Sequence, residues 1–157
     1  AEKLKNYNVP IAVNFTQAAG IALADLLESK NNGEMGEMVG IDIIVTYPSW
    51  PRKWQKEADW LRFKKEGGMT REVISHFIFF TERVLGPLKV IWANTTYPKD
   101  PLLCETDVHA KLKNKDGLFL MVTHYGTISA VTGIVVDSGG AVAYNANTKS
   151  SIEVLLK

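Results

Sequence analysis

The chain has 157 residues, a formal net charge of +1, 46% hydrophobic residues and 22% charged residues, which is the composition of one globular domain. This charge balance argues against a dedicated nucleic-acid-binding protein and against an acidic tail. The single cysteine, Cys104, excludes an internal disulfide, and no apolar run is long enough to span a membrane. We therefore expect a cytoplasmic protein without a nucleic-acid or membrane partner.

The first third of the chain predicts a strand, a helix and a second strand. Residues 9–15 form a short apolar run of strand type, and residues 17–30 carry apolar side chains at helical spacing. Residues 31–33, Asn-Asn-Gly, are expected to end that helix. Apolar and small or polar side chains then alternate over residues 39–47, as in a half-buried strand that stops at Pro48.

The middle of the chain predicts an irregular segment followed by a helix. Residues 50–68 contain three Trp, six Lys or Arg and three acidic residues without a sustained period, which indicates an ordered loop or a short irregular helix. Residues 69–85 predict a helix with Thr70 as its N-cap and Gly86-Pro87 as its stop. This helix is apolar nearly all round, so we expect it to be covered on more than one side.

The remainder predicts a series of short strands at residues 88–94, 104–113, 118–124, 128–136, 141–144 and 152–156. Turn residues at 114–117 and 137–140 favour antiparallel hairpins. The predicted fold class is α+β, an open and mostly antiparallel sheet with helices on one face. The other face is expected to form a homo-oligomer by sheet packing, or else the sheet curves to cover itself.

Glu72 and His76 are the densest candidate for chemistry. In a helix they are spaced i and i+4 and share one face, where a carboxylate can fix the imidazole tautomer for proton transfer. The alternative is a pair that only stabilises the helix. The surrounding phenylalanines favour the functional interpretation, because an apolar setting makes a polar pair costly unless it has other partners.

The segment from Tyr47 to Trp54 is the second candidate, because it combines aromatic rings with cations and two prolines. Such a loop could hold a sugar by stacking or an anion by charge. Simple packing of the loop on the sheet is an equal alternative, and single-stranded nucleic acid is a further one, which would bind with strong salt dependence. His109 and His124 lie on predicted strands without a metal-ligand spacing, so no metal site is expected.

The order of these elements resembles the C-terminal part of the Gfo/Idh/MocA oxidoreductases, the glucose-fructose oxidoreductase and inositol dehydrogenase family. Residues 9–17 look like the last strand of that family's nucleotide-binding domain, and residues 21–36 look like its linking helix with the Gly33-x-x-Gly36 turn. Residues 67–87 resemble the family's catalytic helix, and the strands that follow match its large sheet.

The resemblance implies roles for individual residues. His76 matches the helix histidine that the family uses for proton transfer, and Glu72 stands where many members have Asp. Asn14 and Gln17 fall where members often show an Asn and an Arg facing the active site. The loop from Trp50 to Trp54, here called the Trp loop, occupies the region that lines the substrate pocket. The substrate-binding residues implied are therefore Asn14, Gln17, Trp50, Arg52, Lys53 and Trp54.

The family's Gly-rich fingerprint and its Glu-Lys-Pro motif belong to an earlier Rossmann domain that is absent from this chain. We therefore expect residues 1–36 to be a remnant last strand and linking helix, and residues 37–157 to be a substrate-binding and oligomerisation domain. The implied function is the C-terminal part of an NAD(P)-dependent oxidoreductase of a sugar-like or other small hydroxy or carbonyl compound. NAD or NADP would bind in the intact parent and not to this chain alone. The alternative is a free-standing, non-enzymatic ligand-binding or dimerisation module.

Overall fold

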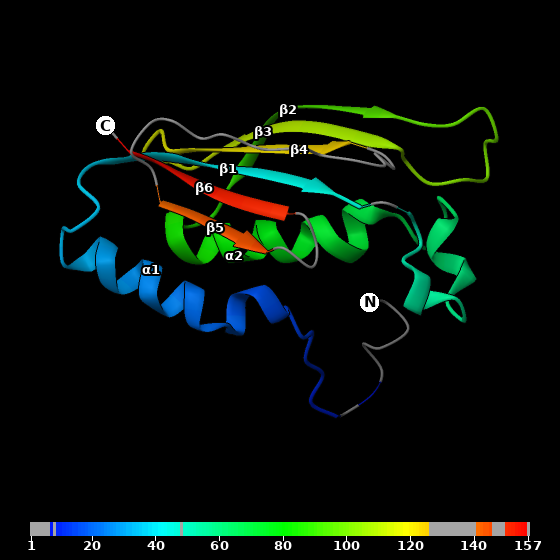
Figure 1. Ribbon diagram of the computed structural model, residues 1–157, viewed down its shortest axis with the longest axis horizontal. Helices are drawn as coiled ribbons and strands as arrows, with labels where there is room; N and C mark the ends of the chain where they lie inside the picture. The colour runs from blue at the N-terminus through cyan, green and yellow to red at the C-terminus, as the bar shows by residue number, and fades with distance from the viewer. Residues whose placement is uncertain (1–6, 8, 48, 126–140, 146–149, 157) are drawn as a thin grey trace.

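The computed structural model describes residues 7, 9–47, 49–125, 141–145 and 150–156. Two α-helices, six strands and several short turns of helix make up this part of the chain (Figure 1). In chain order they are a 3-10 turn at Thr16–Ala19, α1 (Ile21–Asn31), β1 (Met38–Thr46), 3-10 turns at Lys53–Gln55 and Asp59–Arg62, a π-helical turn at Thr70–Ile74, α2 (Ser75–Leu85), β2 (Lys89–Thr96), β3 (Asp107–Lys113), β4 (Phe119–Tyr125), β5 (Ala141–Asn145) and β6 (Ser150–Leu156).

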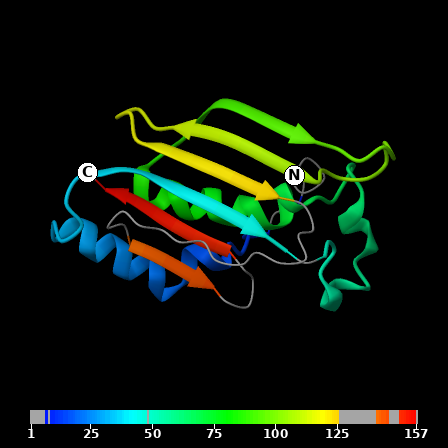
Figure 2. The same cartoon turned by 45° about the horizontal axis from the view of Figure 1, so that its top comes forward.

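The six described strands form one sheet in the order β2-β3-β4-β1-β6-β5. Strands β1 and β4 are parallel, and every other neighbouring pair is antiparallel. Both α-helices lie on the same face of the sheet, and the strands fan across them in the order given (Figures 1 and 2). The predicted α+β fold with an open, mostly antiparallel sheet is therefore confirmed for the described residues.

The core lies between the sheet and α2. The predicted alternation is confirmed from residue 41 onwards, since Ile41, Ile43 and Val45 are almost completely buried and point towards the helices. It fails at Val39, which is only partly buried, because a register shift between Met38 and Gly40 interrupts the pairing with β6. Strand β3 shows the same alternation. Helix α2 contributes Phe77 and Phe80 to this core, as its apolar composition predicts.

The β3–β4 hairpin is tied to the end of α2 by one buried side chain. The Asn114 amide donates to the Leu85 carbonyl at 2.7 Å, and its carbonyl oxygen accepts from the backbone N–H groups of Asp116 and Leu118. This confirms the predicted turn at 114–117. The strand expected at 128–136 and the turn expected at 137–140 lie outside the described residues.

Two predicted helices differ from the observed ones at their N-terminal ends. The helix expected over 17–30 is split, because Gly20 adopts extended backbone between the turn Thr16–Ala19 and α1. The helix expected over 69–85 starts with the π-helical turn, and Thr70 lies inside it, so the predicted Thr70 N-cap is wrong. Instead, the Glu105 carboxylate accepts from the Thr70 backbone N–H at 2.7 Å.

The strand expected at residues 9–15 is not observed. These residues pair with no strand in the described part of the chain, and Val9, Ile11 and Val13 are all more than half exposed. A strand needs a neighbour that supplies backbone hydrogen bonds, and none of the described strands lies beside this segment. Residues 9–15 therefore form an apolar segment that pairs with no described strand, and we refer to residues 9–16, which run into the turn Thr16–Ala19, as the connector.

Among the residues with a described placement, no helix is both long enough and apolar enough to cross a membrane.

Candidate functional site

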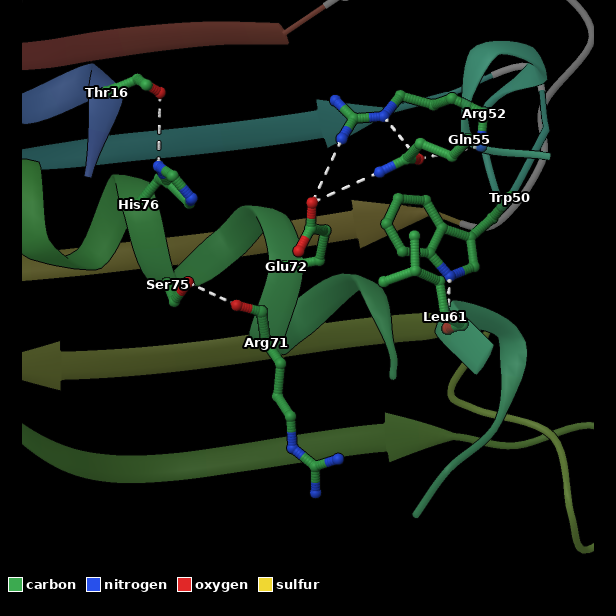
Figure 3. Close-up of polar contacts among 9 residues, drawn as sticks. All are labelled: Thr16, Trp50, Arg52, Gln55, Leu61, Arg71, Glu72, Ser75 and His76. Atoms are coloured by element: carbon green, nitrogen blue, oxygen red, sulfur yellow. Dashed lines mark hydrogen bonds and ion pairs between the residues drawn. The ribbon is translucent and has the colours of Figure 1, made fainter. Parts of the chain in front are cut away.

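The candidate site lies along the N-terminal end of the long helical segment. Glu72 belongs to the π-helical turn and His76 to the first turn of α2. A π turn closes i→i+5 hydrogen bonds, so side chains four residues apart across it do not have the geometry of a regular α-helix. Glu72 and His76 are not hydrogen-bonded to each other, and each has a different partner (Figure 3). The expected orienting contact from Glu72 to His76 is therefore absent.

Glu72 connects the helix to the Trp loop. One carboxylate oxygen of Glu72 lies 3.6 Å from an Arg52 guanidinium nitrogen and accepts a hydrogen bond from the Gln55 amide at 3.3 Å. The buried Gln55 also accepts from the Arg52 backbone N–H and from its Nε, at 3.2 and 2.9 Å. These contacts form a closed polar network that fixes the loop against the start of the helix (Figure 3).

Arg52 is surrounded by aromatic rings. Its guanidinium carbon lies 5.3 Å from the ring centroid of Tyr47, 5.8 Å from that of Trp50 and 4.7 Å from that of Trp54. These distances are within the range of cation–π attraction. Burial raises the pKa of the Tyr47 hydroxyl, and the neighbouring Arg52 cation offsets part of that rise.

The two loop tryptophans have different environments. Trp50 is half-buried and donates its indole N–H to the Leu61 carbonyl at 3.1 Å, which anchors the loop. Trp54 leaves 74% of its surface exposed while Arg52 lies over its ring. Trp50 therefore has a packing role, whereas Trp54 offers a free aromatic surface next to the site.

His76 is held by the connector. Its Nδ1 lies 3.4 Å from the Thr16 hydroxyl, and its ring meets the Phe15 ring edge-on, with centroids 5.3 Å apart at 75°. Phe15 in turn stacks on Phe79 at 4.5 Å and 24°. Phe15 and Thr16 were not predicted from the sequence, although they lie between the predicted site residues Asn14 and Gln17.

The other predicted residues join no polar network. Asn14, Gln17 and Lys53 are exposed, and none makes a side-chain hydrogen bond or ion pair with another described residue. Asn14 and Gln17 flank the two residues that contact His76, so they lie near the candidate site along the chain. Within the described ranges, no three His, Cys, Asp or Glu side chains gather closely enough to hold a metal ion.

Comparison with known proteins finds no matching sequence-family profile and no matching curated protein. Solved structures do match. An Erwinia carotovora atroseptica protein described as an oxidoreductase has a TM-score of 0.62 at 19% identity, over 86% of this chain and 40% of that chain. A 3-ketoreductase from Actinomadura kijaniata in complex with NADP has a TM-score of 0.61 at 18% identity, over 74% and 34%. A Sinorhizobium meliloti protein described as a myo-inositol dehydrogenase has a TM-score of 0.58 at 15% identity, over 99% and 50%.

The chain has the fold of part of a Gfo/Idh/MocA-type oxidoreductase. The resemblance stated from the sequence is thereby confirmed for the fold. The chain spans half or less of the length of these oxidoreductases. Identities below 20% carry no residue roles, so the roles of His76, Glu72 and the Trp loop stay predictions that rest on the geometry of this chain.

Proposed function

We propose that this chain supplies the substrate-binding and proton-transferring part of an NAD(P)-dependent oxidoreductase of a sugar-like or other small hydroxy or carbonyl compound. The observation that carries the proposal is the placement of a half-buried histidine, His76, on the same helical segment that holds the aromatic and cationic loop. This placement occurs in a fold shared with solved sugar-type oxidoreductases.

His76 is the proposed proton acceptor for the substrate hydroxyl. An imidazole can take and return a proton near neutral pH, which suits reversible oxidation of an alcohol to a carbonyl. Nδ1 is engaged by Thr16, so Nε2 is the ring nitrogen left for the substrate. Figure 3 shows the second ring nitrogen directed away from Thr16.

The Trp loop is the proposed binding surface for the rest of the substrate. Trp54 presents an exposed indole that is supported from one side by Arg52, and such a platform stacks well against a pyranose ring or another flat apolar surface. Exposed Lys53 can attract an anionic substituent. Asn14 and Gln17, on either side of the His76 contacts, are proposed to hydrogen-bond substrate hydroxyl groups.

The described residues do not contain the glycine motif that binds a dinucleotide cofactor. A dinucleotide site needs glycines between a strand and a helix, whereas Gly33 and Gly36 follow α1 and lead into β1. We therefore assign NAD or NADP to a nucleotide-binding part outside these residues, and we derive no hydride step from this chain. The unpaired apolar connector, with Val9, Ile11 and Val13 exposed, supports such a neighbour because it offers a strand-type edge.

We also propose that the sheet face opposite the helices forms a homo-oligomer. No described helix lies on that face (Figure 1). Strand β2 lies at the edge of the described sheet and is exposed along its whole length, including Val90, Ile91 and Trp92. Exposed apolar residues of this kind favour association.

The proposed function is tested by measuring nicotinamide reduction by the full-length polypeptide with a panel of free aldoses, inositols and nucleotide sugars. We expect turnover with at least one member, and we expect Trp54→Ala to raise KM for that compound with little change in kcat. Lys56→Ala, an exposed change two residues beyond Trp54, is the matched control. Binding of a panel compound without turnover would contradict the enzyme proposal and would indicate a non-enzymatic ligand-binding module.

A further inference from the structure

The contacts of His76 with the connector suggest how its ring is oriented. Two consecutive connector residues meet the imidazole: the Thr16 hydroxyl lies 3.4 Å from Nδ1, and the Phe15 ring lies edge-on at 5.3 Å. Phe15 is itself fixed by stacking on Phe79, one helical turn after His76. Thr16 is 60 positions away from His76 in the sequence, so the orientation of the imidazole depends on residues far from the helix along the chain.

We propose that Thr16 is a positioning residue that selects the tautomer of His76, by accepting a hydrogen bond from Nδ1–H and thereby leaving the lone pair on Nε2. This inference rests on the proposed function, because it concerns how His76 performs proton transfer. Phe15 limits the tilt of the ring by its edge-on contact, so the hydroxyl and the aromatic ring together fix one orientation.

The proposed tautomer is the one that makes proton transfer possible at the free edge of the ring. When the substrate alcohol is oxidised, its O–H bond breaks and the proton forms a new bond to Nε2, giving an imidazolium, while the nicotinamide cofactor of the intact enzyme would accept the hydride from the carbinol carbon. The Nδ1–H group keeps donating to Thr16 before and after this step, so the contact is never broken. Reduction of the carbonyl returns the same proton from Nε2 to the oxygen.

The opposite tautomer, with the proton on Nε2, could not accept the proton of the substrate hydroxyl. If the Thr16 hydroxyl donated to Nδ1, the ring's only lone pair would be occupied by that bond and Nε2 would already carry a proton. Glu72 does not make the selection in the observed structure, because no hydrogen bond joins it to the His76 ring and its carboxylate is directed to Arg52 and Gln55 instead. The connector thus takes the orienting role that the sequence pattern assigns to Glu72.

The test is nitrogen NMR of histidine-labelled protein at a pH where all three imidazoles are neutral. The signal of His76 is assigned by its loss in His76→Gln. We expect Nδ1 of wild-type His76 to have the shift of a protonated nitrogen and Nε2 that of an unprotonated one. Thr16→Val should move both shifts towards a mixture of tautomers, and Thr16→Ser, which keeps the hydroxyl, should restore the wild-type pattern.

Ser75→Ala is the matched control, because Ser75 precedes His76 but donates to the Arg71 carbonyl and not to the ring. We expect its spectrum to equal that of the wild type. Loss of one neutral hydrogen bond predicts about a fivefold lower kcat for Thr16→Val, with KM nearly unchanged and activity recovered in Thr16→Ser.

The proposal is overturned if wild-type His76 carries its proton on Nε2, or if Thr16→Val leaves the shifts unchanged. These outcomes are distinct from failure of the proposed function, which would appear as undiminished turnover in His76→Gln. Thr16 is exposed, so its substitution removes little buried surface, and circular dichroism of each variant checks that the fold is retained.

Discussion

Removing the Glu72 side chain should loosen the Trp loop and lower global stability by a predictable amount. Glu72→Ala deletes a partly exposed ion pair with Arg52, whose side chains are 35% and 21% exposed, and this pair contributes about 0.5 kcal/mol. It also deletes the charge-assisted hydrogen bond from buried Gln55, at about 1.5 kcal/mol. The free energy of unfolding should therefore fall by about 2 kcal/mol, which is roughly 4–8 °C in Tm for a chain of this size.

The assay is urea denaturation followed by circular dichroism. Glu72→Gln is the matched variant, because its amide oxygen still accepts from Gln55 while the charge is lost. It loses the ion pair and the charge assistance of the hydrogen bond, about 0.5 kcal/mol each, so we expect a loss of only about 1 kcal/mol. A double-mutant cycle of Glu72→Ala with Arg52→Ala should give a coupling energy of about 0.5–1 kcal/mol. Unchanged stability of Glu72→Ala, together with zero coupling to Arg52, would refute the view that this carboxylate anchors the loop.

Three further predictions follow from single contacts. Gly67→Ala should lower the free energy of unfolding by at least 2 kcal/mol in urea denaturation, because the added Cβ would lie 2.2 Å from the Leu61 carbonyl oxygen. Gly33→Ala, with nothing within 4 Å of its added Cβ, should cost only about 1 kcal/mol for its positive φ. Equal losses of unfolding free energy in the two variants would contradict a steric role for the close approach to Leu61. Asn114→Ala should cost about 2–3 kcal/mol, measured in the same way, because it leaves a buried carbonyl at the end of α2 without its donor. Burial raises the pKa of Tyr47, so the unfolded chain loses this proton first, near the ordinary value of 10.0, and stability should decline as the pH rises above about 10. Tyr47→Phe should reduce that decline, and an unchanged decline would refute its assignment to Tyr47.

Alternation and turn chemistry predicted much of the sheet. The period of two in β1 is a direct consequence of burying one face, so Ile41, Ile43 and Val45 could be assigned to the core from the sequence. The β3–β4 hairpin followed from the Asn-Lys-Asp-Gly turn. Strand order is different, because the parallel pairing of β1 with β4 depends on long-range packing that no local pattern encodes.

The helical segment shows where sequence spacing misleads. The i, i+4 pairing of Glu72 with His76 assumes 3.6 residues per turn, and the π-helical turn between them breaks that assumption. Arg52 and Gln55, which engage Glu72, come from a loop without periodicity, so no pattern could place them. The Thr16 contact to His76 spans 60 residues and is likewise invisible without the fold.

The connector illustrates a third limit. An apolar run such as residues 9–15 satisfies the compositional rules for a strand, but a strand exists only where a neighbour supplies hydrogen bonds. In the described part of the chain that neighbour is missing, and the apolar side chains are exposed. The composition of residues 9–15 is that of a strand, but the prediction that they form one was wrong.

The most direct test of the account is the kcat of His76→Ala in the full-length polypeptide, measured at saturating substrate by nicotinamide reduction. General acid–base catalysis typically contributes a factor of about 10²–10⁴, so we expect kcat to fall by at least a hundredfold while the affinity for NAD or NADP stays near that of the wild type. Ser75→Ala should remain fully active. A His76→Ala enzyme with wild-type kcat would contradict the central claim that the substrate proton passes through this histidine.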